Sequence, residues 1–255
     1  MIHPTAIINK NAEIDEGVSI GPYCIIEDKV KIRKGTKLLM HVVIQGNTEI
    51  GENCTISPFA SIGGPPQDLT YKDEDTTVII GNNNIIKDYV TINRGTPHGG
   101  AITKVGNGNF IMAYSHIAHD CKVGNNVIMA NCATLAGHVE VDDFVIFGGL
   151  CAVHQFCKIG KYAFVSGLTG VPKDIPPFII AAGSRSKPYG LNVVGLERHG
   201  FSKEELSKLK KAYRILFRSS LPLETSLKII QDELEGENIN ELINFIKSSK
   251  RGICR

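Results

Sequence analysis

The chain has 255 residues, 42% hydrophobic and 21% charged, so it can bury a large core and is not expected to be disordered. A net charge of +2 gives no overall case for a nucleic-acid partner. Met1 is not followed by a basic and then an apolar segment, and no stretch approaches about 18 apolar residues, so we expect a cytoplasmic protein without an integral membrane segment.

An aliphatic residue recurs at every sixth position from Ile2 to Ile62. After an interruption the same period returns at Ile80, and it runs from Val105 to Val171 after a second one. A helix repeats every 3.6 residues and a simple strand every two, so neither accounts for this period. The pattern predicts a solenoid with three flat faces per turn, in which three hexapeptides make one coil.

The position four residues after each aliphatic residue is usually small, which suits the interior of a tight corner. Five of the seven cysteines share this position: Cys24, Cys54, Cys121, Cys151 and Cys157. Because the chain has no CxxC pair, we interpret these cysteines as small buried apolar residues. We therefore expect no disulfide framework, no bound metal and no cofactor.

The aliphatic residues are often followed by glycine, asparagine or aspartate, as in Ile50-Gly51-Glu52-Asn53 and Val123-Gly124-Asn125-Asn126. Such residues suit turns with unusual backbone angles. In these features the sequence resembles the hexapeptide-repeat family, whose fold is the left-handed parallel β-helix. The resemblance covers residues 1 to about 180.

Two segments rich in turn residues interrupt the repeat, at residues 63–75 and 95–101. Both must loop out of the coil, and insertions in repeat proteins commonly gather on one binding face. They could equally be tolerated surface insertions without a role in binding. We favour a functional role for the first and leave both explanations open for the second.

Histidines gather in the second half of the repeat. His116, His119 and Asp120 share one hexapeptide region, and His138 and His154 follow in later coils. An eighteen-residue coil stacks His119, Gly137 and Gln155 in one column, roughly 4.8 Å apart. A neutral imidazole supported by a carboxylate can act as a general base, and a backbone N–H on the next coil can stabilise an oxyanion. We therefore predict His119 as base, Asp120 as its support and Gly137 as the oxyanion donor.

Past Pro188 the six-residue period ends and helical patterns begin. Ser202-Lys203-Glu204-Glu205 predicts a capping box, and further helices are expected at 223–235 and 239–249. We predict a β-helix domain at residues 1–187 and a helical domain at 188–255 that covers the open end of the solenoid. Between residues 197 and 218 there are seven Lys/Arg and three acids, which indicates either an acidic partner or a solvated helix face.

The histidine motifs, with Gln67-Asp68-Leu69, Asn93-Arg94-Gly95-Thr96 and Gly195-Leu196-Glu197-Arg198, closely resemble those of the UDP-N-acetylglucosamine O-acyltransferases, which begin lipid A synthesis. The resemblance implies a homotrimer that transfers a 3-hydroxyacyl group from acyl carrier protein to the 3-hydroxyl of the sugar. It implies the same catalytic roles as above. Substrate binding is implied for Gln67, Asp68, Thr70, His116, His138, His154, Gln155, Asn192 and Arg198, and acyl-chain contact for Gly149, Gly167 and Arg185.

The sequence departs from that family's pattern at Thr70, where a lysine is common, at Val194, where a glutamate is common, and at His199, which replaces an arginine. The missing lysine leaves open the 3-amino analogue of the UDP-sugar as acceptor. The sequence also allows a related N-acyltransferase, a zinc-dependent hydratase that uses three histidines, and a purely structural β-helix. Bound zinc would indicate the hydratase, and an inert His119 would indicate the structural protein.

Overall fold

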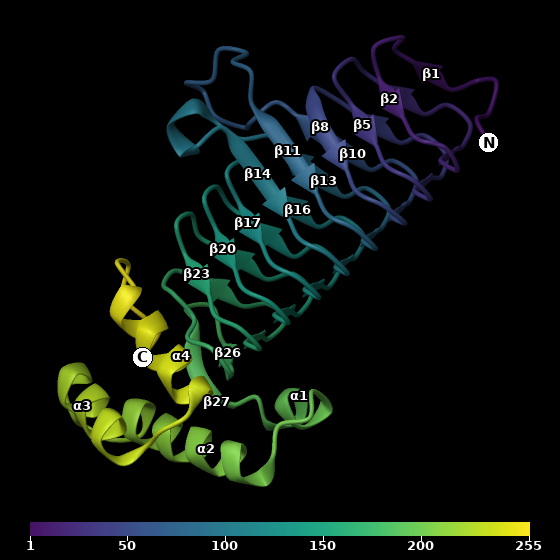
Figure 1. Ribbon diagram of the computed structural model, residues 1–255. Coiled ribbons are helices and arrows are strands. Elements are labelled where there is room, and N and C mark those ends of the chain that lie inside the picture. Colours follow the sequence, from purple (N-terminus) through teal and green to yellow (C-terminus); the bar gives the residue numbers. More distant parts are fainter.

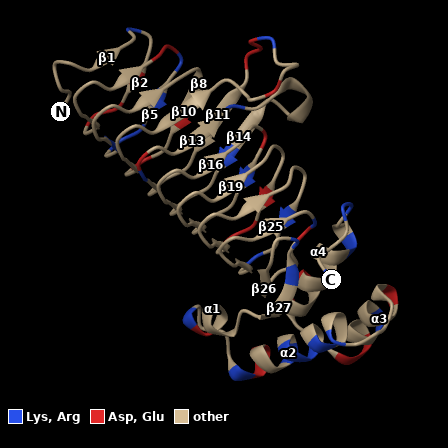
Figure 2. Cartoon of the chain, turned by 180° about the vertical axis from the view of Figure 1, so that it is seen from behind, with Lys and Arg blue, Asp and Glu red and all other residues tan.

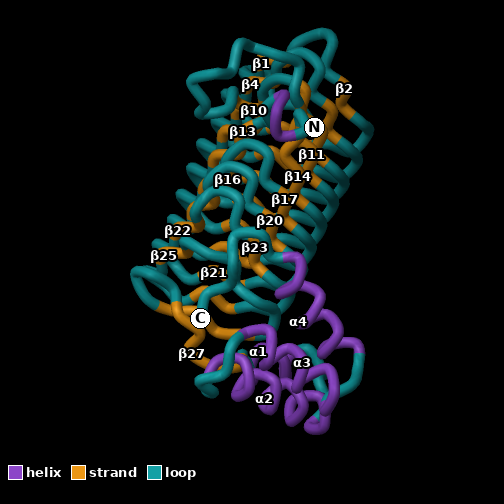
Figure 3. Tube along the Cα trace, turned by 90° about the vertical axis from the view of Figure 1, so that its left-hand side faces the viewer, coloured by secondary structure: helices purple, strands orange, loops and turns teal.

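A computed structural model describes all 255 residues, Met1–Arg255. The chain winds as a left-handed parallel β-helix whose short strands stack into three sheets, and a small group of helices lies at its C-terminal end (Figure 1). The predicted fold class is therefore confirmed. The two chain ends are far apart along the axis of the solenoid (Figure 3).

The first sheet has the order β1 (Ile7–Ile8), β4 (Ile25–Ile26), β7 (Val43–Ile44), β10 (Ser61–Gly64), β13 (Thr91–Asn93), β16 (His116–Ile117), β19 (Thr134–Leu135), β22 (Ala152–Val153) and β25 (Gly170–Val171). The second has β2 (Glu13–Ile14), β5 (Lys31–Ile32), β8 (Asn47–Ile50), β11 (Thr77–Ile80), β14 (Ile102–Val105), β17 (Lys122–Val123), β20 (Glu140–Val141) and β23 (Lys158–Ile159). The third runs from β3 (Ser19–Ile20) through β6 (Lys37–Leu38), β9 (Thr55–Ile56), β12 (Ile85–Ile86), β15 (Phe110–Ile111), β18 (Ile128–Met129), β21 (Ile146–Phe147) and β24 (Phe164–Val165) to β26 (Ile179–Ala182) and β27 (Lys187–Leu191).

The aliphatic position of each hexapeptide points into the solenoid, as the period predicts. Ile44, Ile62 and Ile117, for example, are fully buried in one core of 44 residues. Burying such a side chain contributes roughly 1.5–3 kcal/mol, so the repeat itself is the main source of stability. The first coil differs because nothing covers it, and Ile2 remains 51% exposed.

The cysteines predicted to be corner residues are all buried and free, which confirms their interpretation as small apolar residues. Burial raises the pKa of Cys121 and of Cys151 to about 12, so their thiols stay protonated and unreactive near neutral pH.

The chain turns between sheets at three corners, where one residue per coil has a positive φ. The predicted turn residues Asn53 and Asn126 both have φ 54°. Asparagine tolerates this left-handed conformation better than most residues. These residues lie at one corner, which in later coils carries Phe144, Tyr162 and Phe178 and which we call the third corner.

The other two corners differ from it and from each other. We call the corner between the first and second sheets the histidine corner; its left-handed residues include Asp120, His138 and Phe156. The corner between the third and first sheets is the apolar corner, formed by Tyr23, His41, Phe59, Tyr89, Tyr114, Cys132, Leu150 and Leu168.

Both interruptions loop out of the coil, as expected. Gly63 and Gly64 still belong to β10, so the first loop begins after Gly64 and ends before β11. The second follows β13 and contains the short 3-10 helix η1 (Pro97–Gly99). They project from the same edge of the solenoid (Figure 1). An ion pair joins His98 Nε2 and Asp68 Oδ2 across 3.3 Å, so the two insertions are in contact.

The C-terminal helices are α1 (Val193–Arg198), α2 (Lys203–Phe217), α3 (Leu223–Glu233) and α4 (Glu237–Ser248). Both halves of the predicted capping box are present between Ser202 and Glu205. The short helix α1 was not expected, because it carries no apolar period and is set by its cap, Asn192. The predicted domain boundary after residue 187 lies within β27, which pairs antiparallel with β26, and it stays a prediction.

The helices close the C-terminal end of the solenoid. Tyr213 of α2 and Cys254 join the β-helix core, while the helices share a second apolar cluster that includes Phe178 and Leu196. None of the helices is both long and apolar enough to span a bilayer.

Candidate active site

His119 and Asp120 form a close pair at the histidine corner. Nδ1 of His119 lies 2.8 Å from Oδ2 of Asp120, and the Asp120 side chain is fully buried. An ionised carboxylate only accepts hydrogen bonds, so the proton of the neutral ring belongs on Nδ1. Nε2 of His119 then carries a free lone pair, which is what a general base needs.

The Asp120 carboxylate is fixed by a residue of the second interruption. The backbone N–H of Thr96 donates to Oδ1 at 2.9 Å, and the Thr96 hydroxyl donates to Oδ2 at 2.6 Å. In turn, the Asp120 N–H donates to Oγ1 of Thr103. Thr96 is completely buried, and the sequence pattern did not predict its role. Its separation of 24 residues from Asp120 is no multiple of the coil length, because the insertion intervenes.

The ring of His119 lies over Gly137 on the next coil. The pairing of β16 with β19 sets this register, as predicted from the eighteen-residue spacing. A Cβ atom at Gly137 would come within 2.5 Å of Cε1 and 2.7 Å of Nε2 of His119. Only glycine therefore leaves room for the imidazole. The Gly137 N–H makes no backbone hydrogen bond and remains available as a donor beside the ring.

His138 packs between His119 and Phe156. Its ring meets His119 edge-on with centroids 5.1 Å apart and stacks on Phe156 at 4.4 Å. Burial lowers the pKa of His138. The nearby His119 and His98 lower it further, whereas the Asp120 carboxylate raises it by less than burial lowers it. His138 is therefore neutral near pH 7. Phe156 was not predicted either, although it stands eighteen residues after His138 and the repeat could have found it.

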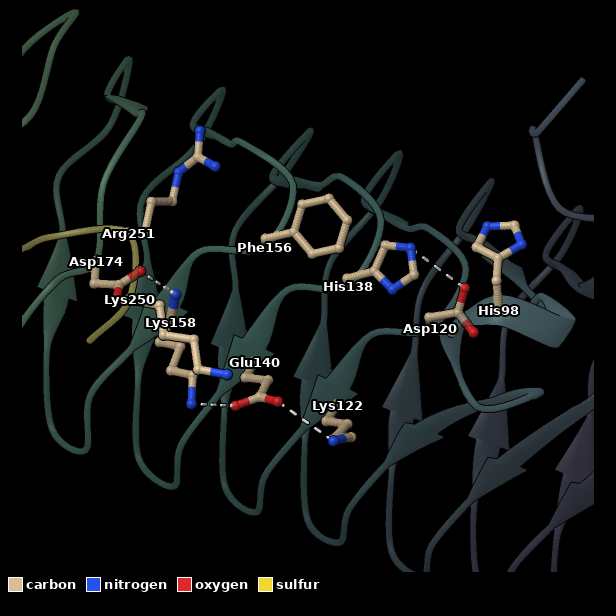
Figure 4. Close-up of a pocket in the computed structure, with 11 residues that line it drawn as sticks. His98, Asp120, Lys122, His138, Glu140, Phe156, Lys158, Asp174, Lys250 and Arg251 are labelled. Carbon is tan, nitrogen blue, oxygen red and sulfur yellow. Dashed lines mark hydrogen bonds and ion pairs between the residues drawn. The ribbon is translucent and has the colours of Figure 1, made fainter. Parts of the chain in front are cut away.

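A cavity of about 610 Å³ opens beside Asp120 and His138 (Figure 4). His98 lies at one end, and Lys158 and Arg251 lie toward the other (Figure 4). Its walls are mainly polar and charged, so it suits a polar, anionic ligand more than a purely apolar one.

The first interruption brings Asp68 to this cluster through His98. Oδ1 of Asp68 accepts hydrogen bonds from the N–H and the hydroxyl of Thr70, both at 2.8 Å. These two bonds lower the pKa of Asp68, with smaller contributions from His98 and His119, so the carboxylate stays ionised. Gln67 is exposed on the same loop.

His154 and Gln155 lie one coil beyond Gly137. Nδ1 of His154 is 2.9 Å from the Arg251 guanidinium, and both His154 and Gln155 are exposed. His116 precedes the pair on β16, where Nδ1 lies 2.7 Å from Oγ1 of Thr91. Burial lowers the pKa of His116, so it too is neutral near pH 7.

The remaining predicted residues lie elsewhere in the chain. Gly149 and Gly167 are adjacent in successive coils at the apolar corner. Arg185 borders a groove of about 310 Å³ that it shares with His154. Asn192 is buried: its side chain accepts from the Gly195 N–H and donates to the Tyr162 carbonyl, which holds α1 at the third corner.

One cluster has metal-ligand residue types, since donor atoms of His119, Asp120 and His138 lie within 4.8 Å of one another. Both Asp120 oxygens already accept hydrogen bonds from Thr96, and Oδ2 also faces His119. His138 Nε2 lies 3.7 Å from Oδ2, too far for a hydrogen bond. This arrangement favours a base and its supporting carboxylate over a metal centre.

Together with the fold and the site, two family matches define the class of protein: a transferase made of hexapeptide repeats. Residues 29–64 and 102–137 match the bacterial transferase hexapeptide family, and residues 174–254 match the family described as UDP N-acetylglucosamine O-acyltransferase, domain 2.

Full-length relatives narrow the class. The acyl-[acyl-carrier-protein]–UDP-N-acetylglucosamine O-acyltransferase of Thermodesulfovibrio yellowstonii is 59% identical over 255 residues, which cover 100% of this chain and 99% of that protein. The UDP-N-acetylglucosamine acyltransferase of Francisella novicida has a structure with a TM-score of 0.97 at 42% identity, covering 100% of this chain and 94% of that one. The structure of LpxA from Acinetobacter baumannii has a TM-score of 0.96 at 43% identity, and the match covers 100% of this chain and 99% of that one. The chain belongs to the UDP-N-acetylglucosamine O-acyltransferase family.

Proposed function

We propose that the protein transfers a 3-hydroxyacyl group from acyl carrier protein to the 3-hydroxyl of UDP-N-acetylglucosamine, the first step of lipid A biosynthesis. The observation that carries this proposal is the pairing of His119 with buried Asp120, with the His119 ring over Gly137, whose N–H makes no backbone hydrogen bond. The donor and acceptor are those in the names of relatives that match the full chain.

The chemistry follows from that geometry. Nε2 of His119 takes the proton of the sugar 3-hydroxyl while the oxygen forms a bond to the thioester carbonyl carbon. The carbonyl electrons move to its oxygen, and the Gly137 N–H donates a hydrogen bond to that oxyanion. When the tetrahedral intermediate collapses, the C–S bond breaks and the leaving sulfur receives the proton from His119. Asp120 stabilises the imidazolium throughout, and no cofactor is needed.

We assign the UDP-sugar to the cavity beside His138, with Asp68 and Thr70 on one side and His154 and Gln155 on the other. His116 and Gln67 border the same edge of the solenoid. Neutral His138 suits a hydrogen bond to an uncharged sugar hydroxyl. Under this assignment Asn192 and Arg198 bind the nucleotide part from a neighbouring copy of the chain.

A homotrimer is proposed because one copy does not hold all of these residues together. The apolar and histidine corners are six residues apart, on the order of 20 Å of extended chain. Gly149 and Gly167, at the apolar corner, therefore meet an acyl chain on His119 more readily from a second copy, whereas Arg185 lies beside His154 of the same chain. The exposed apolar corner offers a contact surface, with Tyr114 59%, Leu150 62% and Leu168 73% exposed. Small glycines at 149 and 167 leave room for a long acyl chain.

Acyl carrier protein is an acidic partner by this proposal, and the helices offer a basic surface for it. Lys and Arg positions are frequent along α2, with acidic positions between them, and α1 ends in Arg198 (Figure 2). Two of the acids are occupied locally, since Glu204 pairs with Lys208 and Glu205 caps the helix. The excess positive charge would assist the encounter with the carrier. A cytoplasmic location stays a prediction.

The 3-amino analogue of the UDP-sugar is the second acceptor to consider. Thr70 is neutral and its hydroxyl donates to Asp68, so that loop position adds no positive charge against an amino group. Steady-state assays with both sugars decide between them. A strong preference for the 3-hydroxyl sugar contradicts the 3-amino acceptor.

The function is tested with purified protein, 3-hydroxyacyl carrier protein and UDP-N-acetylglucosamine. We expect an O-acylated nucleotide sugar, identified by mass spectrometry, and the same rate after treatment with a chelator. Absence of this product with acyl chains of every length tested would contradict the proposal. Activity that depends on added zinc would favour a zinc-dependent hydratase.

A further inference from the structure

The segment Thr96–Gly99 connects the catalytic pair to the first interruption. Thr96 donates two hydrogen bonds to Asp120, and Gly99 lies so close to the same carboxylate that a Cβ atom there would come within 2.1 Å of it. Pro97, the first residue of η1, restricts the backbone between them. The position of His98 is thus fixed from both sides by contacts to Asp120.

From this fixed position His98 reaches Asp68. Its Nε2 lies 3.3 Å from Oδ2 of Asp68, while Thr70 occupies Oδ1. Asp68 itself retains 19% side-chain exposure, so it keeps an accessible edge for a ligand. Thr70 donates to only one oxygen, and the His98 ring is the group that holds the other.

His98 also belongs to the wall of the site. It borders the cavity of about 610 Å³, and its ring centroid is 6.2 Å from that of His138 (Figure 4). The ring is therefore placed between the first interruption and the histidine corner. A residue in this place controls how far the Asp68 loop lies from His119.

We infer that His98 is a positioning residue for the acceptor sugar: it holds Asp68 so that the carboxylate faces the His119–His138 site. The inference rests on the proposed function, because it assigns Asp68 to sugar binding. His98 acts through Asp68 and does not touch the reacting atoms. Its loss therefore weakens binding of the UDP-sugar and leaves the chemical step intact.

The first experiment compares His98→Ala with the wild-type enzyme in steady-state assays. Loss of the contact between the His98 ring and the Asp68 carboxylate predicts a rise of about 10-fold in KM for UDP-N-acetylglucosamine. We expect kcat and the KM for acyl carrier protein to stay within about twofold. His98→Gln retains an N–H donor and should restore most of the affinity. His3→Ala, an exposed histidine at the N-terminus, is the matched control.

A double-mutant cycle then tests whether His98 acts through Asp68. Asp68→Asn and the double variant Asp68→Asn/His98→Ala should have the same KM, because the second change removes a contact already lost. Additive increases in KM, an unchanged KM in His98→Ala, or a fall in kcat alone would each overturn the inference. If the wild-type enzyme acylates no UDP-sugar, the proposed function fails instead, so the two failures are distinguishable.

Discussion

The histidine corner and the apolar corner are built from the same hexapeptides and the same left-handed turns, yet they present opposite chemistry. The left-handed positions of the apolar corner carry a stack of aromatic rings, in which Tyr89 and Tyr114 lie 4.8 Å apart and nearly parallel. The corresponding positions of the histidine corner carry Asp120, His138 and Phe156. One corner offers a surface for contact, and the other offers a site for proton transfer.

The difference shows that separate positions of the repeat determine the fold and the function. The inward-facing residues are mostly aliphatic throughout the repeat. They therefore determine the solenoid but do not distinguish the two corners. Function depends on the outward residues and on the insertions. Thr96 and His98 lie at the histidine corner, where Thr96 holds the Asp120 carboxylate and His98 contacts that of Asp68.

Among changes that leave the catalytic side chains in place, the largest effect is expected from filling the space over Gly137. In Gly137→Ala the new Cβ displaces the His119 ring, and misplacement by about 1 Å costs roughly 100-fold in rate. Gly190→Ala is the matched control, because nothing lies within 4 Å of a Cβ there. Initial rates and circular dichroism of both variants are the measurements. Near-normal activity in Gly137→Ala would refute the predicted contact between ring and backbone.

Breaking the apolar corner should act through assembly. Tyr114→Asp places a charge in the proposed subunit contact, and we expect a shift from trimer to monomer in light scattering, with about tenfold or greater loss of activity. The control is Ile79→Asp, an equally simple change on the charged second sheet. If Tyr114→Asp remains trimeric and active, the apolar corner is not the contact.

A smaller loss is expected when only the support of Asp120 changes. Thr96→Val removes the hydroxyl that donates to Oδ2 and keeps the shape of the side chain. We predict about a tenfold fall in kcat and roughly 1–2 kcal/mol less stability. Thr48→Val removes a similar buried bond of 2.6 Å far from the site. It should lower stability in denaturant unfolding without lowering kcat.

The smallest effect concerns pH and lies outside the site. Desolvation beside α4, with the carboxylates of Glu241, Asp143 and Glu140, raises the pKa of Asp142 to about 6. A raised carboxyl pKa gives stability that is present below the unfolded value of 3.8 and is lost as pH rises through about 6. Asp142→Asn should therefore melt higher than wild type at pH 8 and lose that advantage near pH 4. Because Asp142 is exposed, water screens its charge and a shift of only about 1–2 °C is expected.

Much of the fold can be predicted from the sequence because the side chain that faces the solenoid interior recurs every six residues and is usually aliphatic. The same arithmetic placed His119 over Gly137 and could have found Phe156. It failed for Thr96 and His98, since insertions of irregular length break the register. It also failed for α1, whose six residues depend on one cap at Asn192 and not on an apolar pattern.

The nucleotide-binding roles assigned to Asn192 and Arg198 do not follow from the periodic pattern, for a different reason. Residue patterns describe one chain, and within one chain Asn192 caps a helix at the third corner, away from the histidine corner. A site made by several copies leaves no periodic signal in the sequence of one.

The central claim is that His119, supported by Asp120, is the base of acyl transfer. It is tested most directly by single-turnover acyl transfer with His119→Ala beside Asp120→Asn, after light scattering has established that the assembly is intact. Loss of a general base predicts a rate lower by about 10²–10⁴-fold for His119→Ala, with a smaller loss for Asp120→Asn. A rate within about threefold of wild type for His119→Ala would contradict the claim.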